Sequence, residues 1–138
     1  MKRLLLTSLL ISPFAAADFT CEVKDVKMLQ DDGSLTTHEL HIGTTFVVNR
    51  ASGEVSGKFA PMLDMTVLYV GDDKNAWKGI SSQLINRVIE SGNSPLGVAS
   101  SALNHLDALY IQTYTAGPNK PFIYWDSFLV FTGICTVF

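Results

Sequence analysis

The sequence predicts an all-β, mainly antiparallel fold, either a small closed barrel or a sandwich of about seven or eight strands. Short runs of β-branched and aromatic residues recur along the chain and are separated by turn-forming residues. Only one short stretch has the periodicity of a helix. The chain has two cysteines, Cys21 in the first β-like run and Cys135 in the last, which would join the two ends of the fold.

The N-terminal segment has the features of a cleavable secretory signal. Two basic residues precede a short apolar core over residues 4–11, and three alanines at residues 15–17 provide the small residues that a signal peptidase needs. The apolar run is shorter than the roughly 20 residues that a membrane-spanning helix requires. We therefore expect residues 1–17 to be removed and residues 18–138 to form one domain in the periplasm or outside the cell.

The charge balance argues against a nucleic-acid partner. The chain has 10 Lys and Arg against 13 Asp and Glu, and removal of Lys2 and Arg3 with the leader leaves 8 against 13, a net charge of −5. The remaining basic residues are scattered, whereas nucleic-acid-binding surfaces concentrate them. No later segment is long and apolar enough to span a bilayer. We expect neither nucleic-acid binding nor a membrane span.

Export determines how the two cysteines are interpreted. In an oxidising compartment a pair of cysteines more often forms a structural disulfide than a catalytic thiol or a metal site, and the spacing here excludes a Cys-x-x-Cys motif. Cys21 is in phase with Phe19 on its strand, and Cys135 is in phase with Phe131 on its strand. We therefore predict a Cys21–Cys135 bond between inward-facing residues of the first and last strands, sealing the edge at which the barrel closes.

The first half of the chain predicts strands separated by turns. In the first strand, from Phe19 to Leu29, the apolar residues change face between Val23 and Val26, which predicts a bulge or a bend. Residues 31–34 form a turn. A second strand is expected over residues 36–50.

Two hairpins follow this second strand. Residues 51–53 turn the chain into a strand over residues 54–59, which forms the clearest hairpin of the sequence. Residues 64–70 form another strand, and the turn at residues 71–75 allows residues 76–80 to pair back with it. Trp77 would anchor that second hairpin.

After these hairpins, the spacing of the apolar residues changes. Four apolar residues recur with the spacing of one helical face, which predicts a short amphipathic helix over residues 82–91. Such a helix would plug a barrel end or cover a sheet edge. Residues 94–105 have no clear pattern. A strand is expected over residues 106–114, and after a turn the chain ends in a long β stretch over residues 122–138, bent near Asp126.

Polar residues that could form a catalytic or metal site are few. His38 and His41 do not have the spacing of the His-Glu-x-x-His zinc signature, and on a strand they would project to opposite faces. His105 is isolated. Asp107 and Asp126 lie among apolar residues, and outward-facing strand positions are the simpler interpretation because lone acids are seldom buried. We predict no metal site, no cofactor and no catalytic residues.

Aromatic residues are the remaining candidates for a binding site. In a small closed barrel they usually fill the interior, and the alternative is that they line a cavity for one small apolar ligand. Tyr114 and five other aromatic residues lie in or beside predicted strands, and these five are the candidates for lining a ligand: Tyr69, Trp77, Tyr110, Tyr124 and Trp125.

These observations favour a function in binding rather than catalysis. No Gly-x-Ser-x-Gly setting surrounds any serine, so no nucleophile is indicated. We expect an exported, non-enzymatic binding module for a small apolar ligand or a protein partner. An envelope accessory or inhibitor protein that acts through an exposed edge is the alternative, and an extracytoplasmic hydrolase is the third hypothesis.

Overall fold

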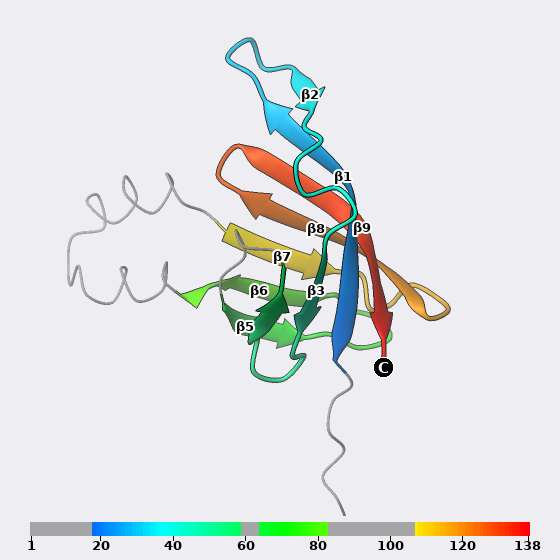
Figure 1. The fold of residues 1–138 in the computed structure, drawn as a ribbon. Helices are drawn as coiled ribbons and strands as arrows, with labels where there is room; N and C mark the ends of the chain where they lie inside the picture. Colours follow the sequence, from blue (N-terminus) through cyan, green and yellow to red (C-terminus); the bar gives the residue numbers. More distant parts are fainter. Residues whose placement is uncertain (1–17, 59–63, 83–106) are drawn as a thin grey trace, which may run out of the picture.

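The computed structural model describes residues 18–58, 64–82 and 107–138, which form a single antiparallel sheet (Figure 1). The sheet order is β4-β3-β1-β9-β8-β7-β6-β5, and β2 pairs with the upper half of β1. The all-β prediction is confirmed. The strands are β1 Phe19–Leu29, β2 Leu35–Thr37, β3 Thr45–Val48, β4 Val55–Gly57, β5 Met65–Val70, β6 Trp77–Ser81, β7 Asp107–Ile111, β8 Asn119–Asp126 and β9 Leu129–Val137.

Some predicted segments lie outside the described residues. These are the leader over residues 1–17, nearly all of the helix expected over residues 82–91, and residues 94–105 with His105. In the described part of the chain, no helix has the length and the apolar character that crossing a membrane would require.

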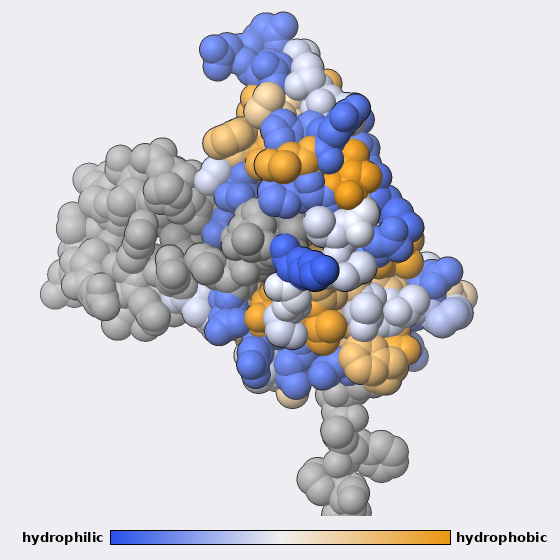
Figure 2. Space-filling view, in the orientation of Figure 1, coloured by the Kyte–Doolittle hydropathy of each residue, from blue (hydrophilic) through white to orange (hydrophobic). Residues whose placement is uncertain are grey.

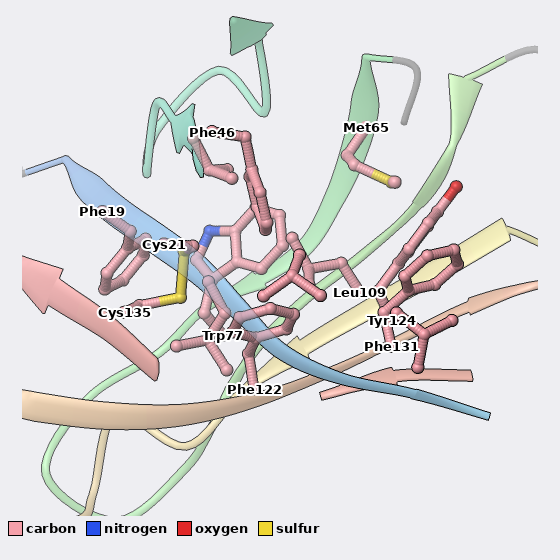
Figure 3. Packing of buried hydrophobic residues seen from close by; sticks show 14 residues of the cluster. Phe19, Cys21, Phe46, Met65, Trp77, Leu109, Phe122, Tyr124, Phe131 and Cys135 are labelled. Carbon is pink, nitrogen blue, oxygen red and sulfur yellow. A yellow bond between two sulfur atoms is a disulfide. The ribbon is translucent and has the colours of Figure 1, made fainter. Parts of the chain in front are cut away.

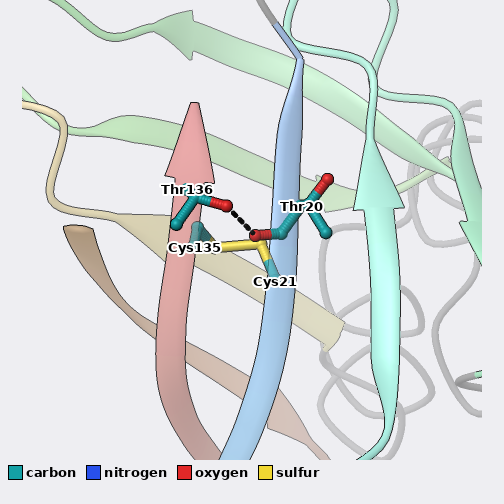
Figure 4. Close-up of a disulfide and its surroundings, with 4 residues drawn as sticks. All are labelled: Thr20, Cys21, Cys135 and Thr136. Atoms are coloured by element: carbon teal, nitrogen blue, oxygen red, sulfur yellow. Dashed lines mark hydrogen bonds between the residues drawn. A yellow bond between two sulfur atoms is a disulfide. The ribbon is translucent and has the colours of Figure 1, made fainter. Parts of the chain in front are cut away.

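The disulfide prediction is confirmed. Cys21 and Cys135 are directly opposed on β1 and β9, with their Cα atoms 3.9 Å apart and both residues fully buried (Figure 4). Such closely spaced antiparallel partners have neighbouring side chains. The expectation that this bond seals the closing edge of the barrel is wrong, because the β3–β4 hairpin extends the sheet beyond β1. The sheet edges are β4 and β5 instead.

The sheet curls into a nearly closed barrel whose seam is bridged by the β3–β4 turn. The Met65 amide donates a hydrogen bond to the Gly53 carbonyl at 2.9 Å, and the Val55 amide donates to Asp64 Oδ1 at 3.0 Å. Gly53 has a φ of +79°, and a Cβ atom there would lie 2.0 Å from the Met65 carbonyl oxygen. Only glycine fits this backbone contact.

The Arg50 side chain fastens the same seam further along β5. Its Nε and Nη2 atoms donate to the carbonyls of Val70 and Gly71 at 2.7 Å and 2.6 Å. The guanidinium carbon lies 5.5 Å from the ring centroid of Phe19. The carbonyl of Arg50 accepts a hydrogen bond from the indole nitrogen of Trp77 at 2.8 Å. One residue thus joins the turn, the edge strand and the core.

The predicted change of face in the first strand is confirmed as a bulge. The β1–β9 register shifts between Val23 and Asp25, and both Val23 and Val26 are fully buried. Because the bulge adds one residue, apolar side chains on both sides of it face the core. A Cβ atom at Gly133, opposite Val23, would lie 2.0 Å from the Glu22 carbonyl oxygen, so the strands approach closely here.

The single strand expected over residues 36–50 is wrong. The chain forms β2, then a loop over residues 38–44, then β3. His41 and Gly43 have positive φ angles of 74° and 81°, and the Gly43 amide donates to the Val23 carbonyl at 2.8 Å. The loop is required because β2 pairs with the upper part of β1 whereas β3 pairs with its lower part.

Buried side chains from the described strands pack together in one hydrophobic cluster (Figure 3). Rings pack edge to face, with centroids 5.4 Å apart for Phe46 and Phe122 and 6.3 Å apart for Phe19 and Trp77. Such pairs stabilise beyond the area they bury. The largest fully buried residues are Trp77, Tyr124, Phe19, Phe46, Phe131, Met65, Leu109 and Ile111.

Candidate functional site

The aromatic residues predicted as ligand-lining do not lie together. Trp77 and Tyr124 are fully buried in the packed core (Figure 3). Tyr69 and Trp125 are 41% and 42% exposed, and Tyr110 is half-buried opposite Lys78 on the outer face of the sheet. The five residues are therefore divided between the interior and the surface, and a role in ligand binding remains a prediction.

Two acidic residues face each other at the upper end of the barrel. Asp107 and Asp126 are directly opposed on β7 and β8, on the same inward face as Tyr124. Asp107 is buried, so the expectation that it faces outward is wrong. It begins a strand whose alternate residues all face the core. Burial, and then the charges of Asp107 and Asp126, raise the pKa of Tyr124 far above its usual value.

The histidines do not gather with these acids into a metal site. His38 and His41 lie in the loop between β2 and β3. The His38 amide donates to the Val26 carbonyl at 2.9 Å, and the His41 ring lies 6.1 Å from the Phe131 ring. Among residues 18–58, 64–82 and 107–138, no three His, Cys, Asp or Glu side chains form a group that could hold a metal ion.

An apolar patch lies on the outer face where β1 meets β2 and β9. Leu29 pairs with Leu35, and the Leu29 amide donates to the Phe128 carbonyl at 3.0 Å. In the adjacent outward row, Val130 lies opposite Trp125. We call these five residues the arm patch. The exposed fractions are 53% for Leu29, 57% for Leu35, 57% for Phe128 and 42% for Trp125.

Leu29 and Leu35 of the arm patch belong to the β1–β2 hairpin, which projects above the barrel (Figure 1). Asp31 and Asp32 occupy the exposed turn at its tip. The Ser34 amide donates to Asp32 Oδ1 at 2.9 Å, and hydrogen bonding by Ser34 lowers the pKa of the Asp32 carboxyl. Lys27, below the patch, donates to Thr37 Oγ1 at 2.7 Å. Asp31 and Asp32 therefore make the tip of the hairpin acidic. Figure 2 shows hydrophobic patches among hydrophilic residues on the face that it displays.

A row of tyrosines lies lower on the outer face, across β5 to β7. The register places Tyr69 opposite Lys78 and Lys78 opposite Tyr110. The Lys78 ammonium lies 6.0 Å from the Tyr110 ring centroid, and the hydroxyls of Tyr110 and Tyr114 are 3.3 Å apart. That hydrogen bond raises the pKa of Tyr114.

Tyr69 also holds the turn between β5 and β6. Its hydroxyl donates to Asp72 Oδ2 at 2.6 Å, while Oδ1 accepts from the amides of Lys74 and Asn75, both at 2.7 Å. These bonds lower the pKa of Asp72 to about 2, and the bond from Tyr69 has the largest effect. The same bond to Asp72 raises the pKa of Tyr69.

Replacement of Tyr69 by Phe is expected to raise the pKa of Asp72 from about 2 towards its ordinary value of 3.8. The pKa of Asp72 is lower in the folded state than in the unfolded state. Its ionised form therefore stabilises the fold above pH 3.8, and this contribution is lost as the pH falls through about 2. Carboxyl-carbon NMR titration measures the midpoint. Tyr110→Phe is the control and should leave the titration midpoint of Asp72 unchanged. An unchanged midpoint in Tyr69→Phe would contradict the role of the Tyr69 hydroxyl in lowering the pKa of Asp72.

The arm patch was not predicted from the sequence, although a signal for it exists. Leu29 and Leu35 flank the predicted turn at residues 31–34, so a hairpin through this turn brings the two leucines close together. Arg50 had no comparable signal, because its partners are carbonyls of a distant strand. The chain matches no protein-family model, and searches of curated proteins and of solved structures give no match.

Proposed function

We propose that this chain is an exported, non-enzymatic binding module that contacts a protein partner through the arm patch. One observation carries the proposal: Leu29, Leu35 and Phe128 are each more than half exposed. Leu29 and Leu35 are the last pair before the turn of a projecting hairpin, and the backbone of Leu29 bonds that of Phe128. Adjoining exposed apolar side chains of this size commonly mark interaction sites on soluble proteins.

A protein partner fits the described residues better than a small apolar ligand. Sites for small ligands are concave and mostly apolar. The space inside the described strands is instead occupied by packed side chains such as Trp77, Tyr124 and Phe131. The arm patch is a protruding surface, which suits a partner that brings its own apolar groove.

The charges beside the patch favour a partner with a basic rim. Asp31 and Asp32 lie at the tip of the hairpin, and Glu39 is exposed in the loop that follows β2. Pairing the patch with itself in a dimer would bring like charges together, which costs affinity. A partner that carries Lys or Arg around an apolar groove would complement both features.

The double variant Leu29→Ser/Leu35→Ser tests the proposal. We expect it to reduce specific capture of a partner from the exported-protein fraction by about tenfold or more, because buried anchor residues dominate binding energy. Capture is quantified by mass spectrometry against the wild type. Leu68→Ser is the matched control, since Leu68 is 58% exposed on β5, away from the patch.

The control variant should capture the partner as the wild type does. Thermal denaturation of both variants verifies folding, since surface substitutions usually change stability by only about 0.5 kcal/mol. Equal capture by the wild type and the double variant, or no specific protein with either, would reject the arm patch as the contact surface.

A further inference from the structure

We propose a second binding site at the lower end of the barrel, for a small zwitterion that carries a carboxylate and an ammonium group. The site is a shallow pocket of about 290 Å³ where β1 begins and β9 ends. This volume is close to the lower limit of about 300 Å³ for small-molecule sites, which suits a free amino acid or a short peptide. Its polar lining is Arg50, Asp72, Asp73, Thr113 and Lys120, and its apolar lining is Phe19 and Val137.

Arg50 presents a guanidinium that is already held in place. Its Nε and Nη2 atoms donate to the carbonyls of Val70 and Gly71, and its carbon lies over the ring of Phe19. A guanidinium has five N–H donors, so several remain after these two bonds. Neutral carbonyl partners leave its charge uncompensated, and a fixed side chain loses little entropy when it binds a carboxylate.

Lys120 brings a second cation to the same pocket. Its ammonium donates to the carbonyl of Thr115 and retains two further donors. Neither Arg50 nor Lys120 forms a salt bridge with a described residue. A ligand carboxylate could therefore accept charge-assisted hydrogen bonds from both side chains.

The ammonium group of the ligand would be bound by Asp73. The neighbouring Asp72 carboxylate is already occupied by Tyr69, Lys74 and Asn75. Asp73 has no hydrogen bond or salt bridge to another residue in the described part of the chain. The buried Thr113 hydroxyl, which donates to the Asn75 carbonyl at 2.6 Å, keeps its own acceptor capacity. Two cations and two carboxylates line the pocket, and Asp73 is the carboxylate that keeps its acceptors for a ligand. Charges of both signs in one small pocket favour a zwitterion over a simple anion or cation.

Titration of the full chain with L-leucine and two single-charge analogues tests the site. The analogues are 4-methylpentanoate, which lacks the amino group, and 3-methylbutylamine, which lacks the carboxylate. Backbone amide NMR should show shifts at residues 71–75 and 113–120. We expect leucine to bind tighter than either analogue by about tenfold or more, the factor that corresponds to one charge-assisted hydrogen bond. Equal affinities for the three compounds overturn the proposal.

Glycyl-leucine separates the two sources of a zwitterion. Tighter binding of the dipeptide than of leucine identifies a peptide site, and the reverse identifies an amino-acid site. Weaker binding of both than of the single-charge analogues overturns the proposal.

Variants then test the assigned residues. Lys120→Gln and Asp73→Asn should each weaken leucine binding by about tenfold. Lys74→Gln is the control, because Lys74 is an exposed cation of the same loop that does not line the pocket. Wild-type affinity in both test variants overturns the assignment. Leu29→Ser/Leu35→Ser should leave leucine binding unchanged, so this result is independent of the arm patch.

Discussion

The double variant Cys21→Ala/Cys135→Ala is expected to lower the free energy of unfolding by about 4–5 kcal/mol. The disulfide joins residues 114 positions apart, and closing so long a loop restricts the unfolded chain strongly. A loss of this size approaches the whole stability of many small domains. The sulfur atoms also fill space between β1 and β9, where both cysteines are fully buried.

Chemical denaturation with and without a reductant measures this effect. Reduction of the wild type should cause a similar loss, whereas the alanine variant should not respond to the reductant. If the variant does not fold at all, the reduced wild type provides the same comparison. Equal denaturation midpoints for the oxidised wild type and the variant would contradict a stabilising role for the bond.

Replacement of Trp77 by Ala is expected to destabilise the fold by about 3–5 kcal/mol. Trp77 is fully buried, and its ring packs so tightly over β6 that a Cβ atom at Gly79 would lie 2.6 Å from it. Its indole nitrogen also donates to the Arg50 carbonyl. The substitution therefore creates a cavity and leaves an acceptor at the seam without its partner, and both effects destabilise.

The second tryptophan is the matched control. Trp125 is 42% exposed on the outer face, so Trp125→Ala should change stability by only about 0.5 kcal/mol. Trp77→Phe keeps a ring but removes the N–H group. It should lower the free energy of unfolding less than Trp77→Ala does. Urea denaturation of the three variants gives the values. Similar losses at Trp77 and Trp125 would contradict the packing described here.

Local alternation in the sequence was sufficient to predict much of the barrel. The change of face between Val23 and Val26 identified the bulge, because a regular strand cannot place both residues in the core. The in-phase positions of Cys21 and Cys135 identified the disulfide. The signal for the bulge lies within a few residues along the chain, whereas the disulfide prediction rests on the only two cysteines of a chain that is expected to be exported.

Features that depend on contacts between distant segments could not be predicted. Gly53 was recognised as a turn residue, but its contact with the Met65 backbone, which helps close the seam, involves a different hairpin. The outward position predicted for Asp107 rests on the rarity of lone buried acids, and its inward position opposite Asp126 follows from the β7–β8 register, which no local pattern indicates. The lower pocket combines residues from loops and strand ends, among them Arg50 in a turn and Lys120 on β8, and no local pattern relates them.

The position of β9 has a consequence for the order in which the chain can fold. The last strand lies between β1 and β8, in the middle of the sheet rather than at an edge. A polypeptide that still lacks residues 129–137 has no template to unite its first strand with β8, and contacts of such long sequence separation form slowly. The nascent chain therefore cannot reach its final architecture until synthesis is nearly finished.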